Sequence, residues 1–133
     1  MAAKRSERAL VEEWRDVLAL HARTMCELDR ALHQHGLGAS DFEVLDVLAE
    51  GKPEGGGSSC RVQELASRVH LSQSALSRLV ARLEKDGLVT RGMCSEDRRG
   101  VRVELTALGR ERHAEVQPLQ REVLSRMLAE RTC

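Results

Sequence analysis

The sequence predicts a single, mainly α-helical domain that carries a small β-hairpin. Of the 133 residues, 41% are hydrophobic but only 2% are aromatic, so the core must be built from Leu, Val and Ala. Such a composition favours packed helices. Apolar residues recur at helical spacing through most of the chain, and two β-prone runs, 88–91 and 101–105, interrupt that pattern. A chain of this length normally folds as one domain, which we expect to span residues 1–133.

Residues 62–87 contain two short helical patterns separated by a tight turn. The first has an apolar face at helical spacing, formed by Leu65, Ala66 and Val69. The second, 73–85, has one buried stripe, formed by Leu76, Leu79, Val80 and Leu83. Ser72 suits the N-cap of the second helix, and Gly87 suits the left-handed residue that ends it. The two patterns predict a helix-turn-helix.

The opposite face of the second helix carries small polar and cationic side chains: Gln73, Ser74, Ser77, Arg78, Ala81 and Arg82. Side chains of these types can contact base edges and phosphates. Taken alone, the helix fits an ordinary amphipathic helix with a solvated face better. The turn before it and the hairpin after it reverse that preference, because a helix-turn-helix followed by a hairpin lays one helix in a DNA groove.

The β-prone runs predict a wing. The segment between them, 92–100, is too long for a minimal turn, so we expect it to project. An arginine on a projecting loop can enter a narrow minor groove, and Asp97 could hold Arg99 there by a charge-assisted hydrogen bond. The alternative is a solvated loop with a weak ion pair. Residues 60–62 are expected to add a short third strand.

The order of these motifs resembles the multiple antibiotic resistance regulator (MarR) family over roughly residues 10–128. The resemblance is strongest over 62–109 and rests on Glu64-Leu65-Ala66, Leu71-Ser72-Gln73-Ser74, Leu83-Glu84-Lys85-Asp86-Gly87-Leu88-Val89, Asp97-x-Arg99 and Leu105-Thr106-x-x-Gly109. The helix-turn-helix part is shared by many regulators, whereas the Asp-x-Arg wing followed by Leu-Thr-x-x-Gly is more specific. The resemblance implies a winged helix-turn-helix homodimer that binds double-stranded, palindromic operator DNA, acts as a repressor, and is released by a small molecule, such as a phenolic ligand, or by an oxidant.

The resemblance also implies positions for the DNA contacts. It places five side chains of 60–106 in the major groove: Gln73, Ser74, Ser77, Arg78 and Arg82. It places Arg99 in the minor groove, oriented by Asp97, and makes Arg98 a phosphate contact. It implies no cofactor.

The charge distribution agrees with this location. The formal net charge of the chain is zero, with 21 Lys and Arg against 21 Asp and Glu. Residues 61–102 hold nine Lys and Arg against five Asp and Glu, whereas residues 1–60 hold seven against eleven. The cationic part therefore coincides with the expected DNA-binding region, as an electrostatic footprint should.

Long helices are expected on both sides of this region, over 6–36 and 107–133. The first ends near Gly36 and Gly38, and the sequence Ser40–Glu43 reads as a capping box that opens the next helix. Thr106 suits the N-cap of the terminal helix, which Pro118 should break or kink. Members of the family usually continue this helix beyond the point that Cys133 marks here. The apolar faces of the first and the terminal helix predict a dimer surface. It is formed by Leu10, Trp14, Val17, Met25, Leu28, Leu32, Leu119, Val123, Leu124 and Met127.

Three alternatives remain open for the effector site. Trp14 could line a pocket for an aromatic ligand, although a core or dimer-seam position is the simpler interpretation. Cys26 could sense an oxidant, although a buried structural cysteine is the simpler interpretation. Cys26, His33, His35 and His113 could bind zinc, but their spacing matches no standard motif, so no metal site is assigned.

Other functional classes find less support in the sequence. No nucleophile, base and orienting group recur at a recognisable spacing, so an enzyme is not expected. No export signal or membrane-length apolar stretch occurs, and the four widely spaced cysteines fit reduced thiols, so we expect a cytoplasmic protein. The main alternative is a winged helix that contacts only other proteins.

Overall fold

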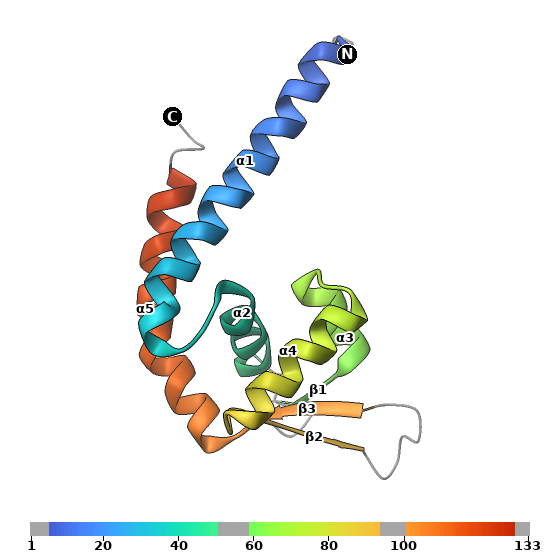
Figure 1. Cartoon of the computed structure of the whole chain (residues 1–133), viewed down its shortest axis with the longest axis vertical. Helices are drawn as coiled ribbons and strands as arrows, with labels where there is room; N and C mark the ends of the chain where they lie inside the picture. Colours follow the sequence, from blue (N-terminus) through green and yellow to red (C-terminus); the bar gives the residue numbers. More distant parts are fainter. Residues whose placement is uncertain (1–5, 51–58, 94–100, 130–133) are drawn as a thin grey trace.

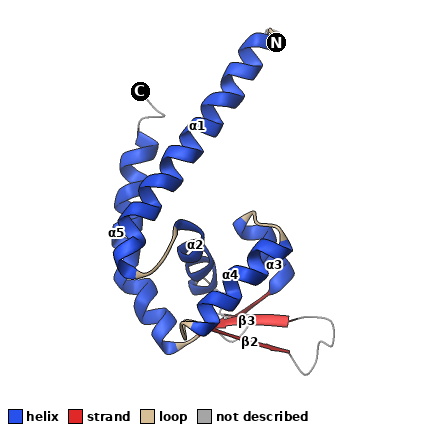
Figure 2. Ribbon diagram, in the orientation of Figure 1, coloured by secondary structure: helices blue, strands red, loops and turns tan. Residues whose placement is uncertain are grey.

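The computed structural model describes residues 6–50, 59–93 and 101–129 (Figure 1). Its elements in chain order are α1 (Glu7–Leu32), the 3₁₀ turn η1 (His33–His35), α2 (Ala39–Ala49), β1 (Ser59–Arg61), α3 (Val62–Val69), α4 (Gln73–Lys85), β2 (Val89–Met93), β3 (Val101–Leu105) and α5 (Ala107–Ala129). The mainly helical fold class with a small sheet is confirmed (Figure 2). None of the described helices combines the length and the apolar character that crossing a membrane requires.

The helices form two parts that meet at α2. Helix α5 packs along the second half of α1, and the first half of α1 extends beyond it (Figure 1). Helix α2 contacts α1 and α5 on one side and α3 on the other. The helix-turn-helix of α3 and α4 and the sheet therefore lie at the far end of the molecule from the N-terminus (Figure 1).

The helix-turn-helix has the predicted boundaries. The Ser72 hydroxyl accepts a hydrogen bond from the backbone N–H of Ala75 at 3.1 Å, which confirms it as the N-cap of α4. His70, which ends α3, has a φ of 58° in the left-handed region that non-glycine residues seldom adopt. Gly87, just beyond α4, has a φ of 79°, as the predicted stop requires.

The three strands form an antiparallel sheet in the order β1-β3-β2. The predicted third strand is confirmed, because Cys60 pairs with Val103 in the register of β1 and β3. The sequence reading started the connecting loop at Gly92, but Gly92 and Met93 still belong to β2. Val103 and Leu105 of β3 are buried, so one face of the sheet closes the core under α2 and α3.

Helix α2 begins by a different device from the predicted one. The sequence predicts Ser40 as the N-cap of a capping box with Glu43, but the helix starts two residues earlier, with Gly38 as its N-cap. The Asp41 carboxylate accepts from the Gly38 N–H at 2.7 Å, and the Asp29 carboxylate of α1 accepts from the Ala39 N–H at 2.7 Å. The prediction was wrong because the second cap comes from another helix, which local sequence does not reveal.

The sequence predicts a break or a kink at Pro118, and helix α5 is continuous through this residue, so a break does not occur. Figure 1 shows the helix curving along its length instead, which agrees with a kink. Its start is as predicted, because the Thr106 hydroxyl accepts from the Gly109 N–H at 2.9 Å. The same hydroxyl donates to the Gly87 carbonyl at 2.6 Å, and so ties α5 to the end of α4.

Candidate DNA interface and adjoining pocket

Helix α4 presents the face that the sequence predicts. Its four core residues, Leu76, Leu79, Val80 and Leu83, are buried. The opposite side is exposed and carries Gln73, Ser74, Ser77 and Arg78. No described residue accepts a hydrogen bond from Arg78 or forms an ion pair with it. The exposed strip of α4 therefore offers small polar groups and a guanidinium with which no described residue pairs. The opposite face of the helix is packed in the core.

The structure separates Arg82 from that strip. Its guanidinium donates to the Asp41 carboxylate, which is 8% exposed and also caps α2. An exposed arginine that pairs with a buried carboxylate is held in one orientation. Arg82 thus joins α4 to the N-terminus of α2, a connection that the sequence reading did not foresee.

Two other arginines, on elements next to α4, each form an ion pair with a glutamate. Arg91 of β2 lies 3.0 Å from the Glu84 carboxylate of α4, and Arg68 of α3 lies 3.3 Å from the carboxylate of Glu50, which follows α2. Both pairs are exposed, so they contribute little to stability. Their side chains stay at the surface beside α4. The wing residues predicted to contact DNA, Asp97, Arg98 and Arg99, lie outside the described residues.

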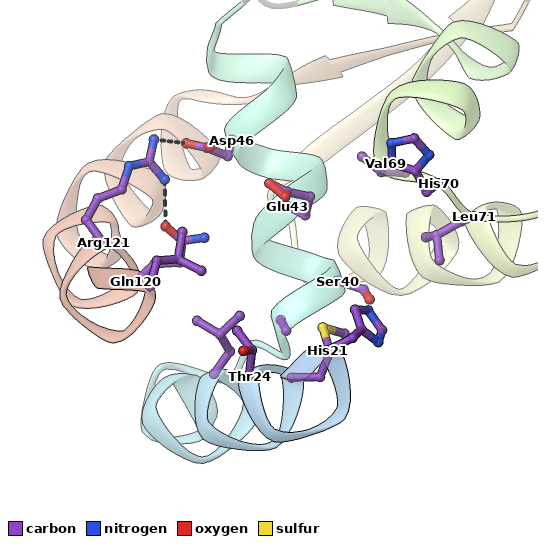
Figure 3. A pocket seen from close by; sticks show the side chains of 14 residues that line it. His21, Thr24, Ser40, Glu43, Asp46, Val69, His70, Leu71, Gln120 and Arg121 are labelled. Atoms are coloured by element: carbon purple, nitrogen blue, oxygen red, sulfur yellow. Dashed lines mark hydrogen bonds and ion pairs between the residues drawn. The ribbon is translucent and has the colours of Figure 1, made fainter. Parts of the chain in front are cut away.

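A cavity of about 590 Å³ opens between α1, α2, the turn of the helix-turn-helix and α5 (Figure 3). A volume of this size suits a small organic ligand. Its apolar lining includes Met25, Leu28, Val69, Leu71 and Leu124. Its polar lining includes His21, Thr24, Ser40, Glu43, Asp46, His70, Gln120 and Arg121.

Asp46 lies at the α5 side of the cavity within a closed network. Its Oδ1 atom is 2.7 Å from His113 Nε2 and 3.1 Å from Arg121 Nη2. Arg121 Nη1 donates in turn to the Gln120 side-chain oxygen at 2.6 Å (Figure 3). The His113 ring stacks on Phe42 with the ring centroids 5.3 Å apart. The network fixes α5 to α2 and satisfies a carboxylate that is 8% exposed.

Glu43 and Thr24 differ from Asp46. Among the described residues, none forms a hydrogen bond or an ion pair with the Glu43 carboxylate. Burial raises the pKa of this carboxyl above its ordinary value of 4.5, and nearby Asp46 raises it further, against the lowering effect of Arg121. The Thr24 hydroxyl is buried and has no hydrogen-bond partner among the described residues. The cavity therefore holds two polar groups with unused hydrogen-bonding capacity.

Comparison with known proteins shows which family this sequence and this fold resemble. The sequence model of the MarR family matches residues 35–100. The structure of AbsC, a MarR family transcriptional regulator from Streptomyces coelicolor, is similar with a TM-score of 0.80 and 29% identity, over 97% of this chain and 84% of that one. Sco3205, a MarR family transcriptional regulator from the same organism solved in complex with DNA, gives 0.82 and 28%, over 98% and 79%.

The chain belongs to the MarR family. NadR in complex with 4-hydroxyphenylacetate is a further structural match, with a TM-score of 0.68 and 26% identity over 97% of this chain and 82% of that one. No curated protein sequence matches the chain. Membership of the MarR family makes the protein a transcription regulator and not an enzyme.

The dimer surface predicted for this MarR family regulator divides into two parts. In α1, Leu10, Trp14 and Val17 are exposed, with Trp14 at 59%. Leu28 and Leu32 are instead buried within the same chain, and Leu28 packs with Val123 and Met127 of α5. Met25, Leu119 and Leu124 are half-buried against these clusters. The sequence predicts that the apolar side of α1 forms one continuous contact surface. In this MarR protomer, however, the second half of that surface packs against α5 of the same chain.

The residues of the three effector hypotheses have different surroundings in the MarR fold. Trp14 is not in the protomer core and does not line the cavity. Cys26 is exposed in the protomer, so the preferred interpretation of it as a buried structural cysteine is wrong. His113 is held by Asp46, and no cluster of three or more metal-binding side chains occurs among the residues that the structure describes.

The sequence analysis named Met25, Leu28 and Leu124 only as dimer contacts and missed the polar residues that line the cavity of this MarR protein. Glu43 and Asp46, which line it, and Asp41 lie in the otherwise apolar helix α2. Charged residues are seldom fully buried without a partner, so acidic residues inside an apolar helix are a usable signal for a polar network or a ligand site.

Proposed function

We propose that the protein is a homodimeric, sequence-specific repressor that binds palindromic operator DNA and leaves it when a ligand occupies the cavity. The exposed strip of α4 carries this proposal, because it lies on a MarR fold whose relative Sco3205 was solved in complex with DNA. The strip would enter the major groove once in each half-site.

Within that interface, we assign different roles to the cations. Arg78 is exposed and unpaired among the described residues, so it is available to bind guanine or phosphate together with Gln73, Ser74 and Ser77. Arg82 acts mainly as a positioning residue, because it already donates to Asp41. In the wing, Arg99 would enter the minor groove under the control of Asp97, and Arg98 would contact phosphate.

The homodimer is supported by the first half of α1. Five large apolar side chains are exposed there: Leu10, Val11, Trp14, Val17 and Leu18. A contiguous apolar surface of this kind on a soluble domain marks an interaction site. A second copy is the occupant that would place two α4 helices on one palindrome.

The cavity supports ligand-controlled release. It is bounded by α1 and α5 on one side and by α2 and the helix-turn-helix on the other, so a ligand there touches both parts of the protomer. NadR was solved with 4-hydroxyphenylacetate, a phenolic ligand. Cys26 is exposed on α1 beside this region, so thiol oxidation is the alternative release signal.

The test begins with selection of binding sites from a random duplex pool by the purified protein. We expect enrichment of a palindrome whose half-sites lie roughly 10 base pairs apart, centre to centre. Arg78→Ala should then weaken binding to that site by about 1–3 kcal/mol and spare random duplex if the side chain contacts a base. Gel shifts at two ionic strengths complete the test, since an absence of salt-dependent binding would identify a module that contacts only proteins.

A further inference from the structure

The chemistry of the cavity restricts the ligands that it can hold, an inference that rests on the proposed release of DNA by a ligand. The cavity has an apolar wall that includes Met25, Leu28 and Leu124, which suits a hydrocarbon or aromatic body. Its charged lining consists of two carboxylates, Glu43 and Asp46, and one guanidinium, that of Arg121.

The guanidinium is already used by the protein. Arg121 donates from one nitrogen to Asp46 at 3.1 Å and from the other to Gln120 at 2.6 Å. The same Asp46 oxygen lies 2.7 Å from His113 Nε2. An anionic ligand would have to displace this network in order to pair with the Arg121 guanidinium. Asp46 already has hydrogen-bond partners in the protein, so it does not require one from a ligand.

Glu43 presents the opposite situation. Its carboxylate is half-buried at the cavity wall, and no described residue pairs with it (Figure 3). A partly buried carboxylate that lacks a partner is costly, and a cationic hydrogen-bond donor would remove that cost. Burial raises the pKa of the Glu43 carboxyl above its ordinary value, as expected for a partly buried carboxylate that forms no ion pair with a described residue.

Thr24 provides a second, independent indication. Its hydroxyl is on α1, at the same cavity, and it is buried without a partner among the described residues. A buried hydroxyl that makes no hydrogen bond needs a donor or an acceptor from elsewhere. A ligand with several N–H donors could satisfy Thr24 and Glu43 together.

We propose that the cavity binds an amphipathic organic cation, namely a protonated amine on an apolar or aromatic body, with its ammonium group bound to Glu43. Aromatic carboxylates, such as the ligand of NadR, should bind weakly here. The other charged and titratable groups that act on Glu43 are His70 at the end of α3, Asp46, Glu50 and Arg121, and His21 of α1 lines the same cavity. Because the pKa of Glu43 is raised, its carboxyl is ionised more fully at higher pH, so binding of a cation should strengthen as the pH rises.

The test is a matched set of three probes with one aromatic body, measured on the full chain by isothermal titration calorimetry at pH 8. The probes are 4-hydroxyphenethylamine, 4-hydroxyphenylacetate and 2-(4-hydroxyphenyl)ethanol, which are cationic, anionic and neutral. We expect the amine to bind about tenfold or more tightly than the carboxylate, with the alcohol between them, because hydrogen bonds to a charged group are the stronger ones.

Two variants and one control assign the effect. Glu43→Gln should remove the preference for the amine, since it keeps the shape and loses the charge. Thr24→Val should weaken the amine and the alcohol while leaving the preference over the carboxylate. Glu84→Gln, at a partly exposed carboxylate of α4 that pairs with Arg91 outside the cavity, should change nothing.

Equal or tighter binding of the carboxylate, or an unchanged amine affinity in Glu43→Gln, would overturn the proposal. These titrations contain no DNA, so they are independent of the test of DNA binding. A protein that binds the amine but no operator would refute the proposed function alone, and one that binds an operator but not the amine would refute the ligand class alone.

Discussion

Arg82 of α4 donates to Asp41, whose second carboxylate oxygen caps helix α2. One buried acid therefore holds both the start of α2 and the direction of α4. The lining of the cavity includes Ser40 and Glu43, on either side of Asp41 in the sequence. A ligand that moves the first turn of α2 would thus act directly on the anchor of α4.

The first prediction concerns this anchor. Arg82→Ala should lower the free energy of unfolding by about 1–3 kcal/mol, because it leaves the Asp41 carboxylate buried without its cation. Urea unfolding followed by circular dichroism measures the change. Arg78→Ala is the matched control on the same helix and should stay within about 0.5 kcal/mol of the wild type. Equal stability of the two variants would show that Arg82 does not anchor α4.

The second prediction concerns the contact between α5 and the end of α4. A Cβ atom at Gly109 would lie 2.1 Å from the Leu88 carbonyl oxygen, so the backbone would have to move. Gly109→Ala should cost about 1–3 kcal/mol or more in thermal or urea unfolding. A Cβ at Gly92 meets no atom within 4 Å, so Gly92→Ala should be tolerated. If Gly109→Ala unfolds like the wild type, the close approach is not required.

Local signals explain which parts of this fold could be predicted. Ser72 and Gly87 act on their own helix ends, and the alternation in 101–105 reflects one buried sheet face, so each was visible in a few residues. The cap of α2 uses Asp29 of another helix, and local sequence does not contain that contact. The same limit applies to the pairing of Arg82 with Asp41, which are 41 residues apart.

The seam of α1 shows a second kind of limit. Apolar spacing predicts that Leu10 and Leu28 lie on one face, but it does not tell which partner covers that face. In the structure α5 covers Leu28 and leaves Leu10 exposed. The cavity could not be predicted either, because its lining comes from α1, α2, α3 and α5 and from the turn between α3 and α4.

The third prediction is a pH dependence that Glu43 imposes. The pKa of its carboxyl is raised in the folded protein by burial, so folding favours the protonated form. The contribution to stability is therefore full below pH 4.5 and is lost as the pH rises through the raised pKa. Glu43→Gln removes this loss, so its melting temperature relative to the wild type should increase between pH 4.5 and pH 7.5. A constant difference across that range would contradict the assignment. Glu84→Gln, which removes a carboxylate that is not among the charges shifting the pKa of Glu43, serves as the control.

The fourth prediction concerns the wing. Arg99→Ala should weaken operator binding, reduce any preference for A·T-rich flanks and lower the salt slope by about one unit per half-site. Asp97→Ala should also weaken binding, although it removes a negative charge near DNA, because Arg99 loses its orientation. Fluorescence anisotropy at several salt concentrations measures both. Tighter binding of Asp97→Ala at low salt would leave the wing only a diffuse electrostatic role.

The fifth prediction concerns assembly. Trp14 is 59% exposed in the protomer and is central to the exposed apolar residues of α1. Trp14→Glu should convert the dimer to a monomer in sedimentation experiments and abolish operator binding, as should removal of residues 1–20. Arg8→Glu, at an exposed site that pairs with Glu12, is a control for added charge on α1. A monomeric variant that keeps full operator affinity would refute the dimer proposal.

The extension of α1 beyond α5 also has a thermodynamic consequence. Helices shorter than about 12–15 residues are only marginally stable in water, and the first half of this 26-residue helix has no packing partner in its own chain among the described residues. We attribute its helical order to the proposed association with a second copy. Helix content, and with it the single tryptophan's emission, should rise with protein concentration, so that no one melting temperature describes the chain. Cellular abundance itself would then set how much of the molecule is folded.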